Sequence, residues 1–142
     1  MMRNVTDFLE QGALRRFPEK IAIIDGTRTL TFAELAAYAK RCAMHFVRRV
    51  EEINQPVVVY LPKCIETVVA NLGIVYSGNA YCNLDVKSPA QRIRNTLEKI
   101  RPTCAITSRV LAGTLRDIAG SDIDVVCIED LMVGDAADDK LI

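Results

Sequence analysis

The sequence predicts an α/β fold, in which a parallel sheet of alternating strand–helix units is preceded by a helix and an antiparallel hairpin. From Pro56 onward, short β-branched runs alternate with segments of helical apolar spacing, the pattern of strand–helix–strand units. Before Pro56, Asp25-Gly26 separates the β-prone runs Ile21–Ile24 and Thr27–Leu30, and this dipeptide favours a two-residue hairpin turn because both residues tolerate positive φ. The 142 residues suffice for one core.

Two helices are expected to flank the hairpin. The segment Asn4–Phe17 has helical apolar spacing, and Pro18 ends it. The second helix starts at Thr31-Phe32-Ala33-Glu34, a capping box in which the threonine hydroxyl and the glutamate carboxylate each accept a helix-end N–H. Its apolar stripe continues to near Glu52.

Four short apolar runs supply the strands of the sheet. Val57–Leu61 is a continuous β-branched run, which is typical of a strand buried on both faces. The other strands are expected at Ala80–Leu84, Cys104–Thr107 and Asp124–Ile128.

Helices are predicted between these strands. Ile65–Tyr76 has helical spacing, and so does the shorter Val110–Ile118. Between them, Ser88-Pro89 indicates a capped helix start with proline at the first helical position, followed by the stripe Ile93, Leu97 and Ile100.

The charges balance overall but not along the chain. Eighteen basic and eighteen acidic residues give no field that would attract nucleic acid. Residues 1–116 hold 17 of the basic and 10 of the acidic residues, whereas residues 117–142 hold one and eight. We therefore expect 1–142 to form a single partial domain, with 129–142 as an acidic connector.

The sequence contains no apolar leader and no stretch apolar enough for a membrane span. Its five cysteines are spread about twenty residues apart without a C-x-x-C pair, and His45 is the only histidine. Clustered zinc ligands are therefore absent, and free thiols indicate a cytoplasmic protein.

Candidate site residues lie where the predicted strands end, because parallel sheets bind ligands outside the carboxyl ends of their strands. These segments are Leu61-Pro62-Lys63, Leu84-Asp85-Val86-Lys87, Thr107-Ser108-Arg109 and Glu129-Asp130. No glycine-rich phosphate loop is found there. Gly73 and Gly78 have the Walker spacing, but Asn79-Ala80 follows them, and they fall at a helix end.

Each candidate has a structural alternative, and the alternative is favoured. Asp85 can orient a ligand or cap the loop before Ser88. Lys63 can meet an anion or remain solvated. Cys64 can be a helix-end thiolate or an inert thiol.

The histidine and the tyrosines are likewise expected to be structural. His45 lacks an acidic partner at i±4, which favours a surface or packed side chain. Tyr60, Tyr76 and Tyr81 are expected to pack against the sheet rather than stack on a cofactor. No catalytic, cofactor-binding or metal-binding residue is assigned.

Five segments in order resemble the adenylate-forming superfamily. Leu30-Thr31-Phe32-Ala33-Glu34-Leu35 is similar to its motif L-[TS]-[YF]-x-E-L, and Gly78–Asp85 is similar to its motif L-K-A-G-x-A-Y-x-P-[LI]-D. Between and after them, Val57–Pro62, Ser88–Arg92 and Ile106-Thr107-Ser108 resemble a family strand, a helix start and a strand end.

The resemblance has departures. Val75-Tyr76-Ser77 stands in place of L-K-A, and Asn83 stands in place of the usual proline. Asp138–Ile142 resembles the lead-in to the family's phosphate-binding loop, which is expected beyond it together with the substrate pocket and the lid. The resemblance therefore implies an acetyl-CoA synthetase-like N-terminal subdomain, and no catalytic residue is carried over.

For a whole enzyme, the resemblance implies a ligase that activates a carboxylate with ATP and magnesium and releases pyrophosphate. The acyl group would pass to coenzyme A or to a carrier-protein phosphopantetheine. The A-Y-x-x-L-D pattern of residues 80–85 favours the amino-acid-activating branch, which includes peptide-synthetase adenylation domains and D-alanine–carrier-protein ligases, over acyl-CoA ligases. The portion alone is expected to be inactive.

Two other classes stay open. One is a complete flavodoxin- or receiver-type binding module, to which the hairpin at Asp25-Gly26 would be foreign. The other is an interaction protein that uses a bare apolar face, which would also allow self-association. A T-S-G-[ST]-[ST]-G-x-P-K-G sequence within about twenty residues after Ile142 would favour the ligase.

Overall fold

The computed structural model describes residues 4–49 and 52–133. A four-stranded parallel sheet has the order β4-β3-β5-β6, and the strands are β3 (Pro56–Tyr60), β4 (Ala80–Leu84), β5 (Cys104–Thr107) and β6 (Asp124–Cys127). The predicted parallel sheet is confirmed. The last strand ends one residue earlier than expected, because Ile128 begins the short helix α7 (Ile128–Leu131).

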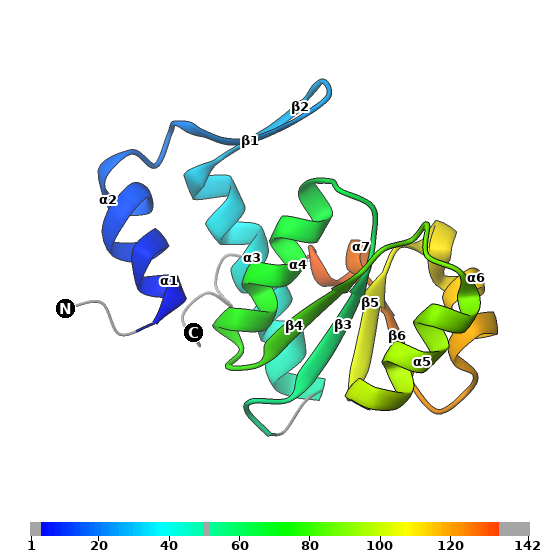
Figure 1. Cartoon of the computed structure of the whole chain (residues 1–142). Coiled ribbons are helices and arrows are strands. Elements are labelled where there is room, and N and C mark those ends of the chain that lie inside the picture. Colours follow the sequence, from blue (N-terminus) through cyan, green and yellow to red (C-terminus); the bar gives the residue numbers. More distant parts are fainter. Residues whose placement is uncertain (1–3, 50–51, 134–142) are drawn as a thin grey trace.

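Helices cover both faces of this sheet (Figure 1). Helices α3 (Phe32–Arg49), α4 (Ile65–Tyr76) and α7 pack on one face, and α5 (Ala90–Ile100) and α6 (Arg109–Ala119) pack on the other. Because strand side chains alternate between faces, Val57 and Val59 join the first layer whereas Val58 joins the second. All three are at most 1% exposed, so the prediction of a strand buried on both faces is confirmed.

The hairpin is present, with its turn one residue later than predicted. Strands β1 (Ile21–Asp25) and β2 (Arg28–Thr31) are antiparallel, and Asp25 pairs with Arg28. The two-residue loop is therefore Gly26-Thr27, with Gly26 at φ 60°. A salt bridge between the Asp25 and Arg28 side chains holds this last pair inside the ladder.

The first helical segment differs from an uninterrupted helix. It consists of α1 (Val5–Phe8), the π-helical segment η1 (Leu9–Ala13) and α2 (Leu14–Arg16). Gly12 lies inside η1 at φ −97° and ψ −106°, which is outside the helical region. A residue without a Cβ adopts such angles at low cost, so the α-helical ladder is interrupted there.

Of the two helix starts predicted from capping signals, one is confirmed. Thr31 and Glu34 form the capping box, with distances of 3.0 and 3.1 Å between the bonded atoms. Ser88 caps nothing, and Pro89 is the N-cap of α5 rather than its first helical residue. The reason is that Pro89 has ψ 144°, an extended value that the helix cannot include.

Candidate functional site

The carboxyl ends of β3 and β4 open onto a cavity of about 580 Å³. Its walls combine apolar side chains with two lysines: Leu61, Pro62, Lys63, Thr67, Asn83, Leu84, Asp85, Val86 and Lys87. Two of the predicted strand-end segments thus lie together. This location is the usual place for ligands in parallel α/β sheets.

Helix α4 supplies one wall of the cavity, and the hairpin fixes where that helix begins. Cys64 is the N-cap residue, but its side chain makes no capping bond. Instead, a carboxylate oxygen of Asp25 accepts a hydrogen bond from the backbone N–H of Ile65 at 3.2 Å. The orphan N–H of this helix end is therefore satisfied from a strand 40 residues earlier in the chain.

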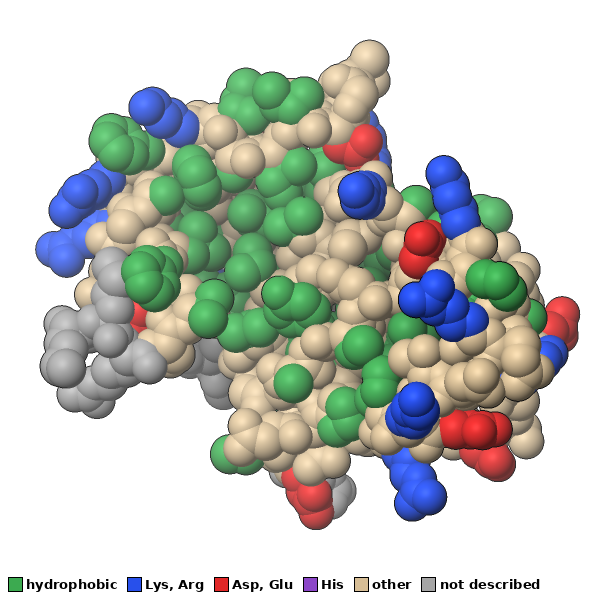
Figure 2. All heavy atoms as spheres, viewed as in Figure 1, with side chains coloured by type: hydrophobic (Ala, Val, Ile, Leu, Met, Phe, Trp, Pro, Cys, Tyr) green, Lys and Arg blue, Asp and Glu red, His purple; other side chains and the backbone are tan. Residues whose placement is uncertain are grey.

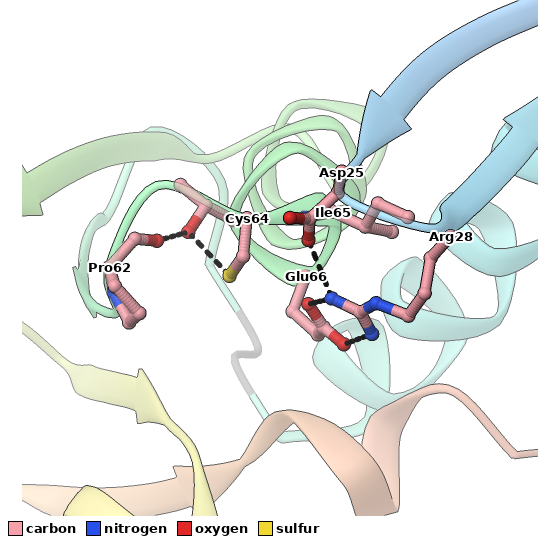
Figure 3. Close-up of polar contacts among 7 residues, drawn as sticks. Asp25, Arg28, Pro62, Cys64, Ile65 and Glu66 are labelled. Carbon is pink, nitrogen blue, oxygen red and sulfur yellow. Dashed lines mark hydrogen bonds and ion pairs between the residues drawn. The ribbon is translucent and has the colours of Figure 1, made fainter.

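Arg28 joins the hairpin to the first turn of α4 (Figure 3). Its guanidinium binds both carboxylate oxygens of Glu66 and one oxygen of Asp25. These bonds hold the pKa of Glu66 at about 2, because the guanidinium stabilises the charged carboxylate more than burial disfavours it. The pKa of Asp25 is lowered as well, first by Arg28 and then by the N–H of Ile65.

The loop between β3 and α4 is held by a threonine. The Thr67 hydroxyl donates to the carbonyl oxygen of Pro62 at 2.6 Å and lies 3.5 Å from the sulfur of Cys64 (Figure 3). Cys64 is half-buried, and its side chain contacts the Thr67 hydroxyl and the Glu66 carboxylate. That carboxylate is already bound at both oxygens by Arg28, so the inert interpretation of Cys64 is favoured.

Asp85 acts within its own loop. One of its carboxylate oxygens accepts from the backbone N–H of Lys87 at 2.9 Å, and its carbonyl accepts from Ser88 at 3.0 Å. This arrangement is an Asx-type turn, which favours the structural alternative for Asp85. Lys63 is exposed at the rim of the cavity.

The strand-end groups of β5 and β6 form a second, separate cluster. The Arg109 side chain pairs with Asp130, and its backbone N–H donates to Glu129 at 3.1 and 3.2 Å. Nearby, the buried Thr107 hydroxyl donates to the Tyr60 carbonyl at 2.7 Å and ties β5 to β3. Arg109 is therefore occupied by acidic neighbours and does not face the cavity with the two lysines.

The histidine and the tyrosines lie outside the cavity lining at β3 and β4. The Nε2 atom of His45, a residue of α3, lies 3.2 Å from the carbonyl oxygen of Val133. The ring therefore connects α3 with the segment that follows α7. Tyr60 is buried in the sheet, and Tyr76 is partly buried and donates to Glu10 at 2.6 Å. Tyr81 is 48% exposed.

The two glycines with the Walker spacing have structural surroundings in the described residues. Lys63 and Lys87 are joined by no glycine-rich loop, and Gly73 is buried in α4 against Cys42. Within residues 4–49 and 52–133, no three His, Cys, Asp or Glu side chains are grouped to hold a metal ion. Gly73 and Gly78 thus have packing and turn roles, as their helix-end position suggested.

Two further cavities are alternative candidates for a binding site. One of about 320 Å³ lies beside the first, between β4 and α5, and includes Cys82 and Arg92. The other, of about 710 Å³, lies between α5 and α6 at the amino ends of β5 and β6. This cavity is larger, but ligands of parallel sheets bind at the carboxyl ends of the strands, and this cavity lies at the amino ends. We therefore favour the cavity at the carboxyl ends of β3 and β4.

Sequence reasoning missed the cluster of Asp25, Arg28 and Glu66 and the role of Thr67. Asp25 and Arg28 are three residues apart, but Glu66 lies 38 residues beyond Arg28, and no local motif joins it to the hairpin. A signal was available only for Asp25, as a polar residue at a hairpin turn.

This fold and cavity define a class: a parallel α/β unit with a hairpin that positions the helix beside the cavity. The family can be stated as well. The sequence matches the AMP-binding enzyme family over residues 9–140, and the chain belongs to this family.

Relatives agree with this assignment. N-(5-amino-5-carboxypentanoyl)-L-cysteinyl-D-valine synthase of Streptomyces clavuligerus is 36% identical over 136 residues, which are 92% of this chain and 17% of that protein. Phosphinothricin tripeptide synthetase PhsC of Streptomyces viridochromogenes is 33% identical over 128 residues, 90% of this chain and 11% of that protein. The chain therefore spans less than a fifth of the length of these relatives.

Solved structures share the fold. The nonribosomal peptide synthetase FmoA3 with α-methyl-L-serine-AMP bound superposes with a TM-score of 0.79 at 27% identity, over 88% of this chain and 14% of that one. The acetyl-CoA synthetase-like α/β subdomain expected from the sequence is thus confirmed.

Proposed function

We propose that this chain supplies the N-terminal portion of an ATP-dependent ligase that forms an aminoacyl-adenylate and passes the acyl group to a thiol. The observation that carries the proposal is the match to the AMP-binding family over nearly the whole chain, with peptide synthetases as relatives of at least 30% identity. ATP and magnesium would be bound mainly by parts of the enzyme other than residues 4–49 and 52–133. This part of the proposal is supported by the lack of a glycine-rich loop beside Lys63 and Lys87 and by the lack of a cluster of metal ligands within these residues.

The role of the described residues in this ligase is to build one wall of a site. Arg28 and Asp25 fix the start of α4, Thr67 fixes the loop after β3, and Asp85 fixes the loop after β4. The substrate would be a small carboxylate, an amino acid in particular, and the acceptor would be coenzyme A or a carrier protein.

Free thiols support a cytoplasmic location, which we include in the proposal. None of the five cysteines forms a disulfide bond. Within the described part of the chain, no helix has both the length and the apolar character that a bilayer crossing needs.

An apolar face supports association with another protein surface, a second copy of this chain in the first instance. Figure 2 shows hydrophobic side chains gathered over the hairpin, the N-terminal helical segment and α4. Ile24 is 71% exposed, Phe8 66% and Ile21 56%. Sedimentation velocity of the wild type against Ile24→Asp tests this: concentration-dependent dimers lost in the variant support it, and a wild-type monomer at high concentration refutes it.

Pyrophosphate exchange with the isolated chain separates the ligase portion from an independent module. The assay uses ATP, magnesium and a panel of amino and fatty acids, with calorimetric titration of ATP in parallel. We expect background exchange and no ATP binding tighter than millimolar, because exposed lysines contribute about 0–1 kcal/mol each and millimolar affinity needs about 4 kcal/mol. Micromolar ATP binding, or exchange with any acid, would contradict the expectation that the portion is inactive alone.

A further inference from the structure

The N-terminal helical segment is attached to the rest of the molecule in an unusual way. None of the residues of α1, η1 and α2 is buried, whereas α4 alone has five buried residues. We call residues 5–16 the N-terminal arm. Its apolar residues Leu9, Ala13 and Leu14 are only partly buried, so less apolar area holds this segment than holds α4, and we place it toward the low-stability end of the molecule.

The Glu10 carboxylate attaches this arm to two helices of the core. Glu10 accepts a hydrogen bond from the Tyr76 hydroxyl at 2.6 Å, and its carboxylate lies 3.0 Å from the Lys40 ammonium. Tyr76 ends α4 and Lys40 is in the middle of α3, so this single side chain spans both helices. The side chains of Lys40 and Glu10 are 25% and 35% exposed, which leaves the ion pair partly shielded from solvent.

The backbone of the arm departs from helical angles at two residues. At the centre of the arm, Gly12 interrupts the helix in η1. At its end, Phe17 has φ −138° and ψ 52° and leaves the helix. Immediately afterwards, the carbonyls of Pro18 and Lys20 accept from Ala33 and Phe32 at 2.9 and 3.0 Å, so the chain beyond Phe17 is fixed to the start of α3.

We propose that the N-terminal arm opens as a unit while the α/β core stays folded, with Phe17 as the hinge and Glu10 as the latch. Opening frees the middle of α3 and the end of α4, which Glu10 now bridges, and it exposes the bonds after Arg15 and Arg16 to proteases. When the arm is released, the surface of α3 and α4 around Lys40 and Tyr76 becomes exposed to solvent. This inference does not depend on the ligase function.

Native-state trypsin cleavage after Arg15 and Arg16 measures this opening. In Glu10→Ala the cleavage rate should rise about fivefold, the factor expected for a partly shielded ion pair with its hydrogen bond. Glu19→Gln is the matched control, because Glu19 is exposed and lies beyond the hinge, and its rate should equal the wild type. Lys40→Met should reproduce part of the increase by removing the second partner.

Hydrogen exchange followed by mass spectrometry gives the second readout. Peptides of the arm should exchange faster in Glu10→Ala than in the wild type, while peptides covering β3 and β5 keep their protection. The proposal is overturned if Glu10→Ala and Glu19→Gln are cleaved at equal rates. It is equally overturned if the arm is as protected as β3 in the wild type, because the two would then unfold together.

Discussion

At the residue scale, the side chains that hold the site in shape are paired with partners far away in sequence. Arg28 contacts Glu66, and Asp25 caps Ile65, so the hairpin and α4 hold each other. Sequence reasoning located Asp25 at a turn but had no means to pair it. Asp85 differs, because its partner is two residues away and the capping role was therefore foreseen.

Acid should weaken the link between the hairpin and α4. The pKa of Glu66 is lowered to about 2, so its contribution to stability is present above the pKa of the unfolded chain and is lost as pH falls toward 2. We expect the difference in unfolding free energy between wild type and Glu66→Gln, about 1 kcal/mol or less at this accessible pair, to shrink from pH 5 to pH 2. Urea unfolding at several pH values measures it, and a difference that grows on acidification would contradict this account.

Removing the side chain at each of the two predicted caps should change the unfolding free energy by different amounts. Thr31→Ala is expected to lower the unfolding free energy by about 1 kcal/mol, because the N–H of Glu34 loses its acceptor. Ser88→Ala should have little effect, because Ser88 makes no capping bond in α5. Equal denaturation midpoints for the two variants would show that Thr31 does not cap α3.

At the element scale, local signals placed most helices and strands, and errors arose where tertiary contacts decided. The bounds Ile65–Tyr76 are as predicted, because a strong apolar period and a following Ser77-Gly78 define them. The hairpin turn shifted by one residue because Arg28 is held by Glu66, which local turn preferences do not include. The interruption at Gly12 was likewise invisible to the apolar spacing.

Helices α3 and α4 pack closely at a glycine. A Cβ added at Gly73 would lie 2.6 Å from the Cβ of Cys42 and 3.0 Å from the carbonyl oxygen of Ala39. The closeness of these helices explains why Cys42 is fully buried and why burial raises the pKa of its thiol to about 12.

Adding a methyl group at Gly73 should therefore push the two helices apart. Gly73→Ala is expected to cost about 1–3 kcal/mol of unfolding free energy by overpacking. Gly113→Ala in α6 is the control, because a Cβ there has nothing within 4 Å, and it should stabilise by up to about 1 kcal/mol. Chemical denaturation of both variants measures this, and a stable Gly73→Ala would mean that α3 and α4 are farther apart.

At the scale of the whole molecule, the order of the motifs predicted more than any single site residue. The match to the AMP-binding enzyme family covers residues 9–140, which include the hairpin, the capping box and all four parallel strands. The cavity at β3 and β4 could be anticipated from the topology alone, because parallel strand ends meet at one edge. The polar contacts around this cavity could not be anticipated, because they depend on side chains that the fold brings together from the hairpin and α4.

The role of residues 129–142 as an acidic connector remains a prediction. Residues Ile128–Leu131 form α7, and Ile128 and Leu131 are each 1% exposed, so the first part of 129–142 is anchored to the core. Positions 134–142 lie outside the described residues. Their role as a connector, and the resemblance of Asp138–Ile142 to the lead-in of a phosphate loop, stay expectations.

Exchange activity of a chimaeric enzyme tests the central claim most directly. Residues 9–140 would replace the matching segment of a peptide-synthetase adenylation domain, and ATP–pyrophosphate exchange would be measured with that domain's own amino acid. We predict exchange above background with unchanged amino-acid preference, because the chain supplies the scaffold and not the triphosphate site. A second chimaera carrying Arg28→Ala should lose stability with the preference retained. A folded first chimaera without any exchange would contradict the assignment of this chain to the adenylate-forming ligases.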